Sequence, residues 1–132
     1  MGRKRRDVTD AELAILQVLW DRGRMTIRQV AEILYPGGSV SEYATVKKLL
    51  TRLEEKGCVG RDDREATHSF EATITRDVLL GQRLNSIAEE LCGGSRTPLL
   101  MNLLKEQKLT ASDRVELRRF LNDILQKRPK QS

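Results

Sequence analysis

Few side chains in this sequence have the types and spacing that bond-making chemistry requires. The chain has one histidine, His68, and two cysteines, Cys58 and Cys92, neither of which belongs to a Cys-x-x-Cys pair. A tetrahedral zinc site within one chain would depend heavily on carboxylates. No serine or cysteine has a histidine at a suggestive position, and no glycine-rich loop has the pattern that cradles a phosphate. We therefore expect a protein that is not an enzyme and needs no metal or cofactor, with ordinary thiols at both cysteines.

The remaining chemistry is electrostatic. The 132 residues include 24 Lys and Arg against 19 Asp and Glu, which gives a net charge of +5. Residues 1–75 nevertheless hold 13 basic and 12 acidic side chains. A polyanion such as DNA would thus have to be bound there by a few placed cations rather than by a general positive field. Residues 3–6 form a basic arm. The arm is either a solubilising tail or a contact to DNA, and we give these two interpretations equal weight.

The first half of the chain predicts three helices and a hairpin. Residues 9–12 and residues 26–29 each have capping-box spacing, and each box is expected to open a helix. A third helix is expected over residues 41–56, where Gly57 stops it. The apolar period then changes from about 3.6 to about 2 over residues 57–75, which predicts a β-hairpin with a polar turn from Arg61 to Glu65. This order of elements is the winged-helix plan.

The third predicted helix has two distinct faces. At 100° per residue, Val46, Leu49, Leu50 and Leu53 share one face, which we expect to be buried. Small and hydroxyl side chains suit base edges in a major groove, whereas Lys and Arg suit phosphates. The alternative interpretation is that these charged side chains form an ordinary solvated helix surface. The position of the helix directly before the hairpin favours DNA binding instead. The amino end is also expected to offer free amides to a phosphate. The predicted DNA-facing side carries Ala44, Lys47, Lys48, Thr51, Arg52 and Glu55, with Tyr43 and Thr45 on its shoulders.

The second half is expected to be helical and self-associating. Of residues 76–132, 18 are Val, Leu, Ile, Met or Phe, more than three short helices can enclose. A large exposed apolar surface is unusual for a soluble monomer, and pairing with a second copy is the simplest way to cover it. We therefore predict a DNA-binding domain over residues 1–75 and a helical dimerisation domain over residues 76–132. The predicted dimer contacts are Leu80, Leu84, Ile87, Leu91, Leu99, Leu100, Leu103, Leu104, Leu117, Phe120, Leu121 and Ile124.

Several segments carry a family resemblance over about residues 8–126. They are Thr9–Leu13, Val18–Trp20, Tyr43–Val46 and Leu50–Gly57, followed by Gly93-Gly94, Lys108–Thr110 and Glu116–Arg118. These segments resemble the penicillinase repressor family, which includes methicillin-resistance repressors and copper-responsive repressors. The resemblance implies a mainly α, homodimeric winged-helix repressor. It would bind a palindromic double-stranded DNA operator and block transcription until an upstream signal arrives.

The resemblance also implies roles for individual residues. Thr45, Lys47, Lys48, Thr51 and Arg52 would lie in the major groove, and the wing, which carries Arg64, would follow the DNA backbone. The carboxy-terminal helices would intertwine into the dimer.

The signal that relieves repression is less well defined by the resemblance. In the resistance repressors, a membrane sensor pathway leads to proteolysis, at a bond that would fall near Met101-Asn102. The residues there match poorly, and the carboxy-terminal Cys-x-Cys motifs of copper-responsive members are absent. Position 48 is Lys where the family often has Thr, so the operator sequence is expected to differ.

Two further expectations concern location and an alternative function. The sequence has neither a secretory signal nor an apolar segment long enough to span a membrane, so we expect a cytoplasmic protein. The alternative function is a winged-helix adaptor that binds another protein. An adaptor would expose apolar or aromatic anchors on the third helix instead of cations.

Overall fold

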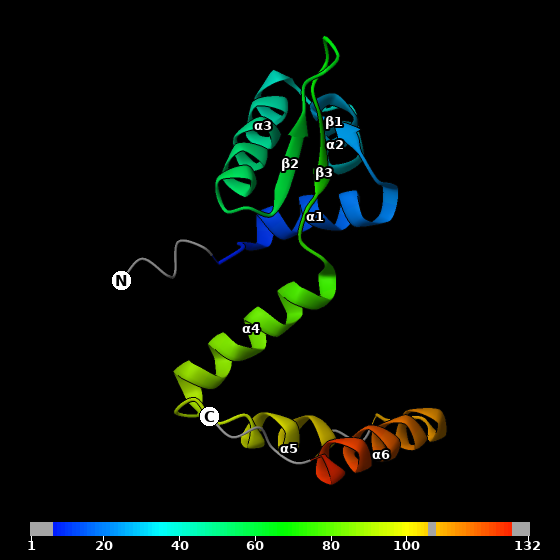
Figure 1. Ribbon diagram of the computed structural model, residues 1–132. Coiled ribbons are helices and arrows are strands. Elements are labelled where there is room, and N and C mark those ends of the chain that lie inside the picture. The colour runs from blue at the N-terminus through cyan, green and yellow to red at the C-terminus, as the bar shows by residue number, and fades with distance from the viewer. Residues whose placement is uncertain (1–6, 106–107, 128–132) are drawn as a thin grey trace. The chain divides into compact units, whose positions relative to one another are not determined.

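The computed structural model describes residues 7–105 and 108–127 and is mainly helical (Figure 1). The basic arm at residues 3–6 lies outside the described residues. Contacts divide the chain into two compact units between Leu84 and Asn85, a point inside α4. The predicted boundary at residues 75 and 76 coincides with the start of α4. The elements within the described residues are α1 (Asp10–Arg22), β1 (Met25–Thr26), α2 (Ile27–Leu34), α3 (Val40–Glu55), β2 (Val59–Asp62), β3 (Ser69–Ala72), α4 (Arg76–Leu91), α5 (Thr97–Lys105) and α6 (Ala111–Gln126).

Side-chain caps fix the starts of the first two helices, as the sequence predicts. The Thr9 hydroxyl accepts a hydrogen bond from the Glu12 amide at 3.2 Å, and the Glu12 carboxylate accepts one from the Thr9 amide at 3.0 Å. Thr26 and Gln29 make the same reciprocal pair at 3.1 and 2.9 Å. Each pair satisfies amide groups that the first turn of a helix leaves without partners, so both predicted capping boxes are confirmed.

The third helix starts earlier than predicted. It begins at Val40 rather than at residue 41, with Ser39 as its cap, and Glu42 completes the capping box. Its last residue is Glu55, and Gly57 follows with a φ of 78°, a conformation that glycine adopts without steric cost. The Ser-x-x-Glu spacing from Ser39 to Glu42 was a readable signal for this start.

The wing belongs to a three-stranded antiparallel sheet with the order β1-β3-β2. The predicted hairpin is confirmed, but β2 extends to Asp62, so the turn starts later than expected and projects beyond the helices (Figure 1). The third strand, β1, was not predicted. It pairs Met25 with Phe70 and Thr26 with Ser69, and so joins the start of α2 to the wing.

One apolar core holds the amino-terminal unit together. It contains the predicted seam of α3, and each of these four leucine or valine side chains is at most 8% exposed. Phe70, at 2% exposed, belongs to this core and is not a surface aromatic of the wing. Trp20 packs against the core and donates a hydrogen bond from Nε1 to the Ile74 carbonyl at 2.8 Å. Other core residues are Val8, Ile15, Leu16, Val18, Leu19, Met25, Val30, Cys58, Val59 and Leu79.

The carboxy-terminal unit differs sharply from this compact arrangement. Gly93 and Gly94 follow α4 with φ values of 59° and 88°, which confirms the predicted break. A reciprocal cap between Thr110 and Asp113 opens α6. Within the described residues, neither α5 nor α6 has a buried side chain in the single chain. These helices therefore have little tertiary packing of their own.

Candidate nucleic-acid interface

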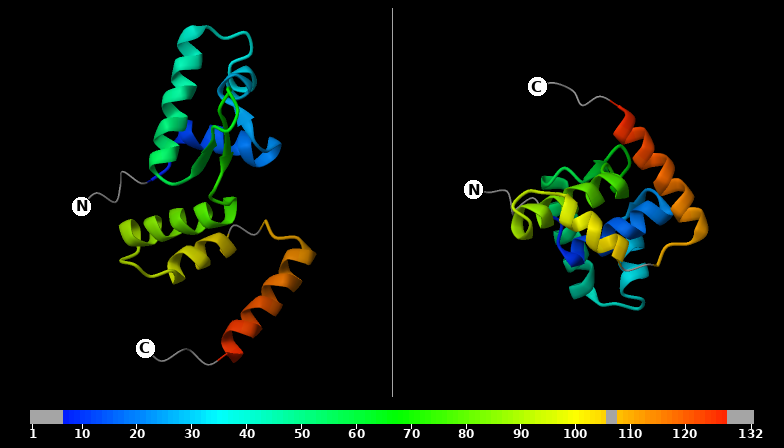
Figure 2. Two further views of the ribbon diagram at one scale, coloured as in Figure 1. Left: turned by 45° about the horizontal axis from the view of Figure 1, so that its top comes forward. Right: turned by 90° about the horizontal axis from the view of Figure 1, so that it is seen from below.

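Burial of one face of α3 determines which side chains its other face presents. Val46, Leu50 and Leu53 are at most 1% exposed and anchor the helix against α1, α2 and β2. The helix consequently lies at the edge of the amino-terminal unit with its far side free of other elements (Figures 1 and 2). On that side Ala44, Lys47, Lys48, Arg52 and the acidic Glu55 are exposed, and Thr51 is half-buried. We call Ala44, Lys47, Lys48, Thr51 and Arg52 the outer face of α3, and Glu55 lies at its carboxy-terminal end.

The cations of the outer face keep their charge available. Lys47, Lys48 and Arg52 make no ion pair with any residue that the structure describes. Five other basic residues of the amino-terminal unit do form ion pairs: Arg24, Lys56, Arg61, Arg64 and Arg76. Three unpaired cations therefore lie together on the open side of α3, as a phosphate-binding surface requires, whereas Arg22 and Arg28 are exposed on other helices.

Hydroxyl groups flank and interrupt these cations. The Thr45 hydroxyl donates to the Ser41 carbonyl at 3.1 Å, and the Thr51 hydroxyl donates to the Lys47 carbonyl at 3.0 Å. Each hydroxyl oxygen retains lone pairs that can accept a hydrogen bond from a base. Tyr43, on the shoulder of the helix, is 38% exposed. Small, hydroxyl and cationic side chains thus share one helical surface.

The amino end of α3 is not the open anion site that the sequence suggests. The Ser39 hydroxyl accepts from the Ser41 amide at 3.2 Å, so this amide is already engaged. The Glu42 carboxylate accepts from the Ser39 amide at 2.6 Å and from the Ser39 hydroxyl at 3.0 Å. These hydrogen bonds hold the pKa of Glu42 below its usual range and keep a negative charge at this end. That charge opposes a phosphate there.

Ion pairs hold the wing in shape and neutralise part of its charge. Arg64 binds Asp62 through Nε at 3.0 Å and Nη2 at 2.7 Å, and Arg24 reaches the same carboxylate at 2.8 Å. The hydrogen bonds from Arg64 are the main cause of the lowered pKa of Asp62. Arg61 stacks over the Phe70 ring at 5.2 Å and binds Glu54 at 2.9 Å. Arg64 is 80% exposed, so it is accessible to DNA, but it already has a partner.

The side chains predicted for contact between copies are mostly exposed in the single chain. In α4, Leu80, Ile87 and Leu91 are 54%, 38% and 79% exposed, whereas Leu84 is half-buried. In α5 and α6, Leu99 and Leu117 are half-buried, and the other predicted residues are exposed: Leu100, Leu103, Leu104, Phe120, Leu121 and Ile124. Leu125, at 78% exposed, was not predicted but has the same character.

A buried ion pair inside the amino-terminal unit was also not predicted. Lys56 Nζ lies 2.6 Å from a carboxylate oxygen of Glu12, whose side chain is 1% exposed, and donates to the Asp7 carbonyl at 2.7 Å. This pair joins the end of α3 to the start of α1. Beside it, burial raises the pKa of the Cys58 thiol, which is unfavourable for a reactive thiolate.

Other kinds of site find no support in the part of the chain that the structure describes. Across residues 7–105 and 108–127, no helix is long and apolar enough to cross a membrane. The same residues contain no group of three or more His, Cys, Asp or Glu that could hold a metal ion. His68 is exposed, and its ring nitrogen lies 3.4 Å from Arg61 Nη1.

A winged helix with unpaired cations on the free side of its third helix defines a class of DNA-binding transcription regulators. Comparison with known proteins identifies the family within this class. Residues 8–123 match the penicillinase repressor family, and the chain belongs to it. It is therefore a DNA-binding transcriptional repressor of the winged-helix type.

Two relatives that are penicillinase repressors match this chain over most of their length. The penicillinase repressor of Staphylococcus aureus is 25% identical over 96% of this chain and 100% of its own length. The penicillinase repressor of Bacillus licheniformis is 21% identical over 88% and 90%. A crystal structure of the YusO protein from Bacillus subtilis is similar with a TM-score of 0.49 and 20% identity, over 95% of this chain and 79% of that one.

Proposed function

We propose that the protein acts in the cytoplasm as a homodimeric repressor that binds a palindromic operator, without catalysis, and is relieved by an upstream signal. The outer face of α3 would lie in the major groove, with Ala44, Lys48 and Thr51 toward the bases. The observation that carries this proposal is the gathering of unpaired Lys and Arg on the one free side of α3. The rival adaptor function would need apolar anchors on that side, where three of the five residues are cationic.

The state of the carboxy-terminal helices supports the proposed dimer. α5 has 9 residues and α6 has 16, and in proteins most of the stability of such helices comes from tertiary packing of an amphipathic face. Their apolar side chains have no cover in the single chain. A second copy would bury them and would place two α3 helices on successive major grooves. The half-sites would then lie about 34–36 Å apart, or a multiple of this spacing.

The proposal is tested first by replacing Arg52 with alanine. We expect weaker binding to operator and scrambled duplexes alike, because a phosphate contact carries no sequence information. Because each copy in the dimer loses one phosphate contact, the slope of log affinity against log salt should fall by about 1.8, or about 0.9 for each lost contact. Fluorescence anisotropy with the DNA upstream of the protein's own gene, at several salt concentrations, measures both quantities.

A matched control for this variant is Arg22→Ala, which removes an exposed arginine from α1 instead. It changes the net charge by the same amount and should leave the salt slope within error of the parent. If Arg52→Ala binds both duplexes as the parent does, α3 does not dock as proposed.

The wing offers a second test of DNA contact. In Asp62→Asn the charged partner of Arg64 is removed, and its guanidinium group becomes available to phosphates, whereas Arg24 keeps its ion pair with Glu71. We expect tighter binding to any duplex and a salt slope steeper by about 0.9 for each new phosphate contact. The same anisotropy titration detects this change.

Asp63→Asn is the control for the wing, because Asp63 is an exposed neighbour that makes no ion pair with the described residues. It produces the same change in net charge without releasing an arginine. Equal behaviour of the two variants would mean that only net charge matters and that Arg64 does not contact the backbone.

A further inference from the structure

The last helix, α6, combines an exposed apolar stripe with two edges of opposite charge. The stripe is formed by Leu117, Phe120, Leu121 and Ile124, and the last three are 61%, 44% and 49% exposed. At 100° per residue, Glu116 and Asp123 fall on one side of this stripe, and Arg114 and Arg118 fall on the other. The pattern gives the helix an acidic edge and a basic edge along one apolar face.

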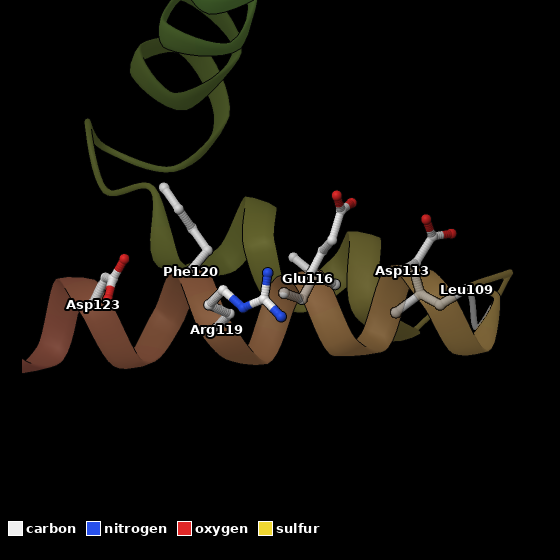
Figure 3. A pocket seen from close by; sticks show the side chains of 7 residues that line it. Leu109, Asp113, Glu116, Arg119, Phe120 and Asp123 are labelled. Atoms are coloured by element: carbon white, nitrogen blue, oxygen red, sulfur yellow. The ribbon is translucent and has the colours of Figure 1, made fainter.

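The acidic edge borders a hollow of about 590 Å³ beside the apolar stripe. The hollow is lined by Leu109, Asp113, Glu116, Leu117, Arg119, Phe120 and Asp123. In Figure 3 the side chains of Asp113, Glu116 and Phe120 project to the same side of the helix. Asp113 also accepts a hydrogen bond from the Thr110 amide at 3.1 Å, so the acids that remain for an outside partner are Glu116 and Asp123.

The basic edge borders a separate hollow of about 410 Å³. Arg114, Val115, Arg118, Arg119 and Asn122 line it. Among the residues that the structure describes, none of the charged side chains of α6 forms an ion pair. Both edges therefore present charge without an ion-pair partner next to uncovered apolar side chains, and Arg119 borders both hollows.

Symmetry limits how such a helix can pair with its own copy. If the two-fold axis runs parallel to the helices, the acidic edge of each α6 faces the basic edge of the other on both sides. If the helices run antiparallel, acidic edge faces acidic edge and basic faces basic, and like charges repel. In coiled coils, the charged residues on both sides of the apolar seam determine the partner and its orientation in the same way, because opposite charges attract and like charges repel.

Resting on the homodimer proposed above, we propose that the occupant of this face is α6 of a second copy in parallel orientation. The apolar stripes would pack together. At a rise of about 1.5 Å per residue, Glu116 of each copy would lie level with the space between Arg114 and Arg118 of the other, and Asp123 would lie about 7.5 Å beyond Arg118 on the same side. The charged edges would thus make the dimer selective for identical chains. Related repressors with a different edge pattern would be excluded by unpaired or repelling charges.

Charge reversal tests this pairing. The acid-reversed variant carries Glu116→Arg and Asp123→Arg, and the base-reversed variant carries Arg114→Glu and Arg118→Glu. In a parallel pair each variant alone sets like charges against each other on both sides. We expect self-association at least about tenfold weaker than in the parent, with recovery at high salt because these exposed charges are screened. Sedimentation over a range of protein concentrations measures the dimerisation constant.

Two further samples separate charge pairing from damage to the helix. An equimolar mixture of the acid-reversed and base-reversed variants should form a 1:1 heterodimer, detected by native mass spectrometry. The variant with all four substitutions should again associate with itself like the parent. If neither sample regains association, the single-edge effect does not come from charge pairing and the inference is wrong.

The remaining outcomes distinguish the parallel pairing of α6 from the homodimer on which it rests. If each single-edge variant dimerises like the parent, the copies do not pair through parallel α6 helices, although the homodimer stands. An antiparallel pair gives this result, because one reversal leaves the number of like-charge contacts unchanged. A parent chain that remains monomeric at tens of micromolar would overturn the homodimer itself.

Discussion

Replacing Lys56 with methionine is expected to lower the free energy of unfolding by about 3 kcal/mol. The variant leaves the Glu12 carboxylate, 1% exposed, without the cation that lies 2.6 Å away. Removing one partner of a buried ion pair typically costs about 3–5 kcal/mol, and we take the lower end because the Lys56 side chain is 15% exposed. Urea unfolding at fixed protein concentration, followed by circular dichroism, measures this loss.

Two comparisons make the result specific to the pair. Lys48→Met is the same substitution at an exposed position of the same helix and should change stability by less than about 0.5 kcal/mol. Adding Glu12→Gln to Lys56→Met should recover part of the lost unfolding free energy. Glutamine can still accept the hydrogen bond from the Thr9 amide, but it does not leave a buried charge without a partner. Additive effects of the two substitutions would show that Lys56 and Glu12 are not coupled.

The pH dependence of stability should change in the same variant. Burial acts to raise the pKa of Glu12, but the hydrogen bonds from Lys56 and Thr9 and the charge of Lys56 outweigh it. The pKa therefore lies below its ordinary value of 4.5. The parent should lose this contribution as the pH falls from about 4.5 through the lowered pKa. In Lys56→Met burial remains while the main lowering interaction is gone. The difference in stability between parent and variant should therefore shrink as the pH falls.

The outcome also bears on DNA binding. Lys56 lies at the end of the helix that presents Lys47, Lys48 and Arg52, and its pair with Glu12 ties that end to α1. A destabilised but folded variant should still bind DNA at low temperature, since Lys56 is not on the outer face. Complete loss of binding with an intact fold would instead assign Lys56 to the interface.

Local spacing predicted the helices of the amino-terminal unit well because their signals are local. The boxes at Thr9 and Thr26 join residues three apart, and the buried seam of α3 repeats every three to four residues. The strand β1 has two residues, too few to display a period, and it exists only because Phe70 and Ser69 pair with it. Sequence spacing cannot reveal an element whose hydrogen-bond partners lie more than 40 positions away.

The candidate site shows the same division between local and distant interactions. Which residues of α3 face outward follows from its buried seam, so the outer face could be predicted without the structure. The sequence could not predict which basic side chains lack an ion-pair partner, because the partners are distant along the chain. Lys56 pairs with Glu12, 44 positions away, and Arg24 pairs with Asp62, 38 positions away. The structure thus adds to the sequence a distinction among basic residues: some hold the fold together, and those on the outer face remain available.

The effect on operator binding should be largest when the dimer is broken. The double variant Phe120→Asp and Ile124→Asp places two carboxylates in the apolar stripe of α6, where the parent side chains are 61% and 49% exposed. Neither residue belongs to the core of the amino-terminal unit, so that unit should remain folded. A monomer would bind one half-site at a time. Operator affinity should then fall by at least about 100-fold, the low end of the gain from linking two binding modules.

Val115→Asp is the matched control for this variant. Val115 is 57% exposed on the same helix but lies about 160° from Leu117, outside the stripe. It should dimerise and bind the operator like the parent, whereas the double variant should sediment as a monomer. Because α5 and α6 lack buried side chains of their own, the monomer should also lose helix content by circular dichroism. A double variant that is monomeric yet binds the operator as tightly as the parent would mean that two joined copies are not what gives the repressor its affinity.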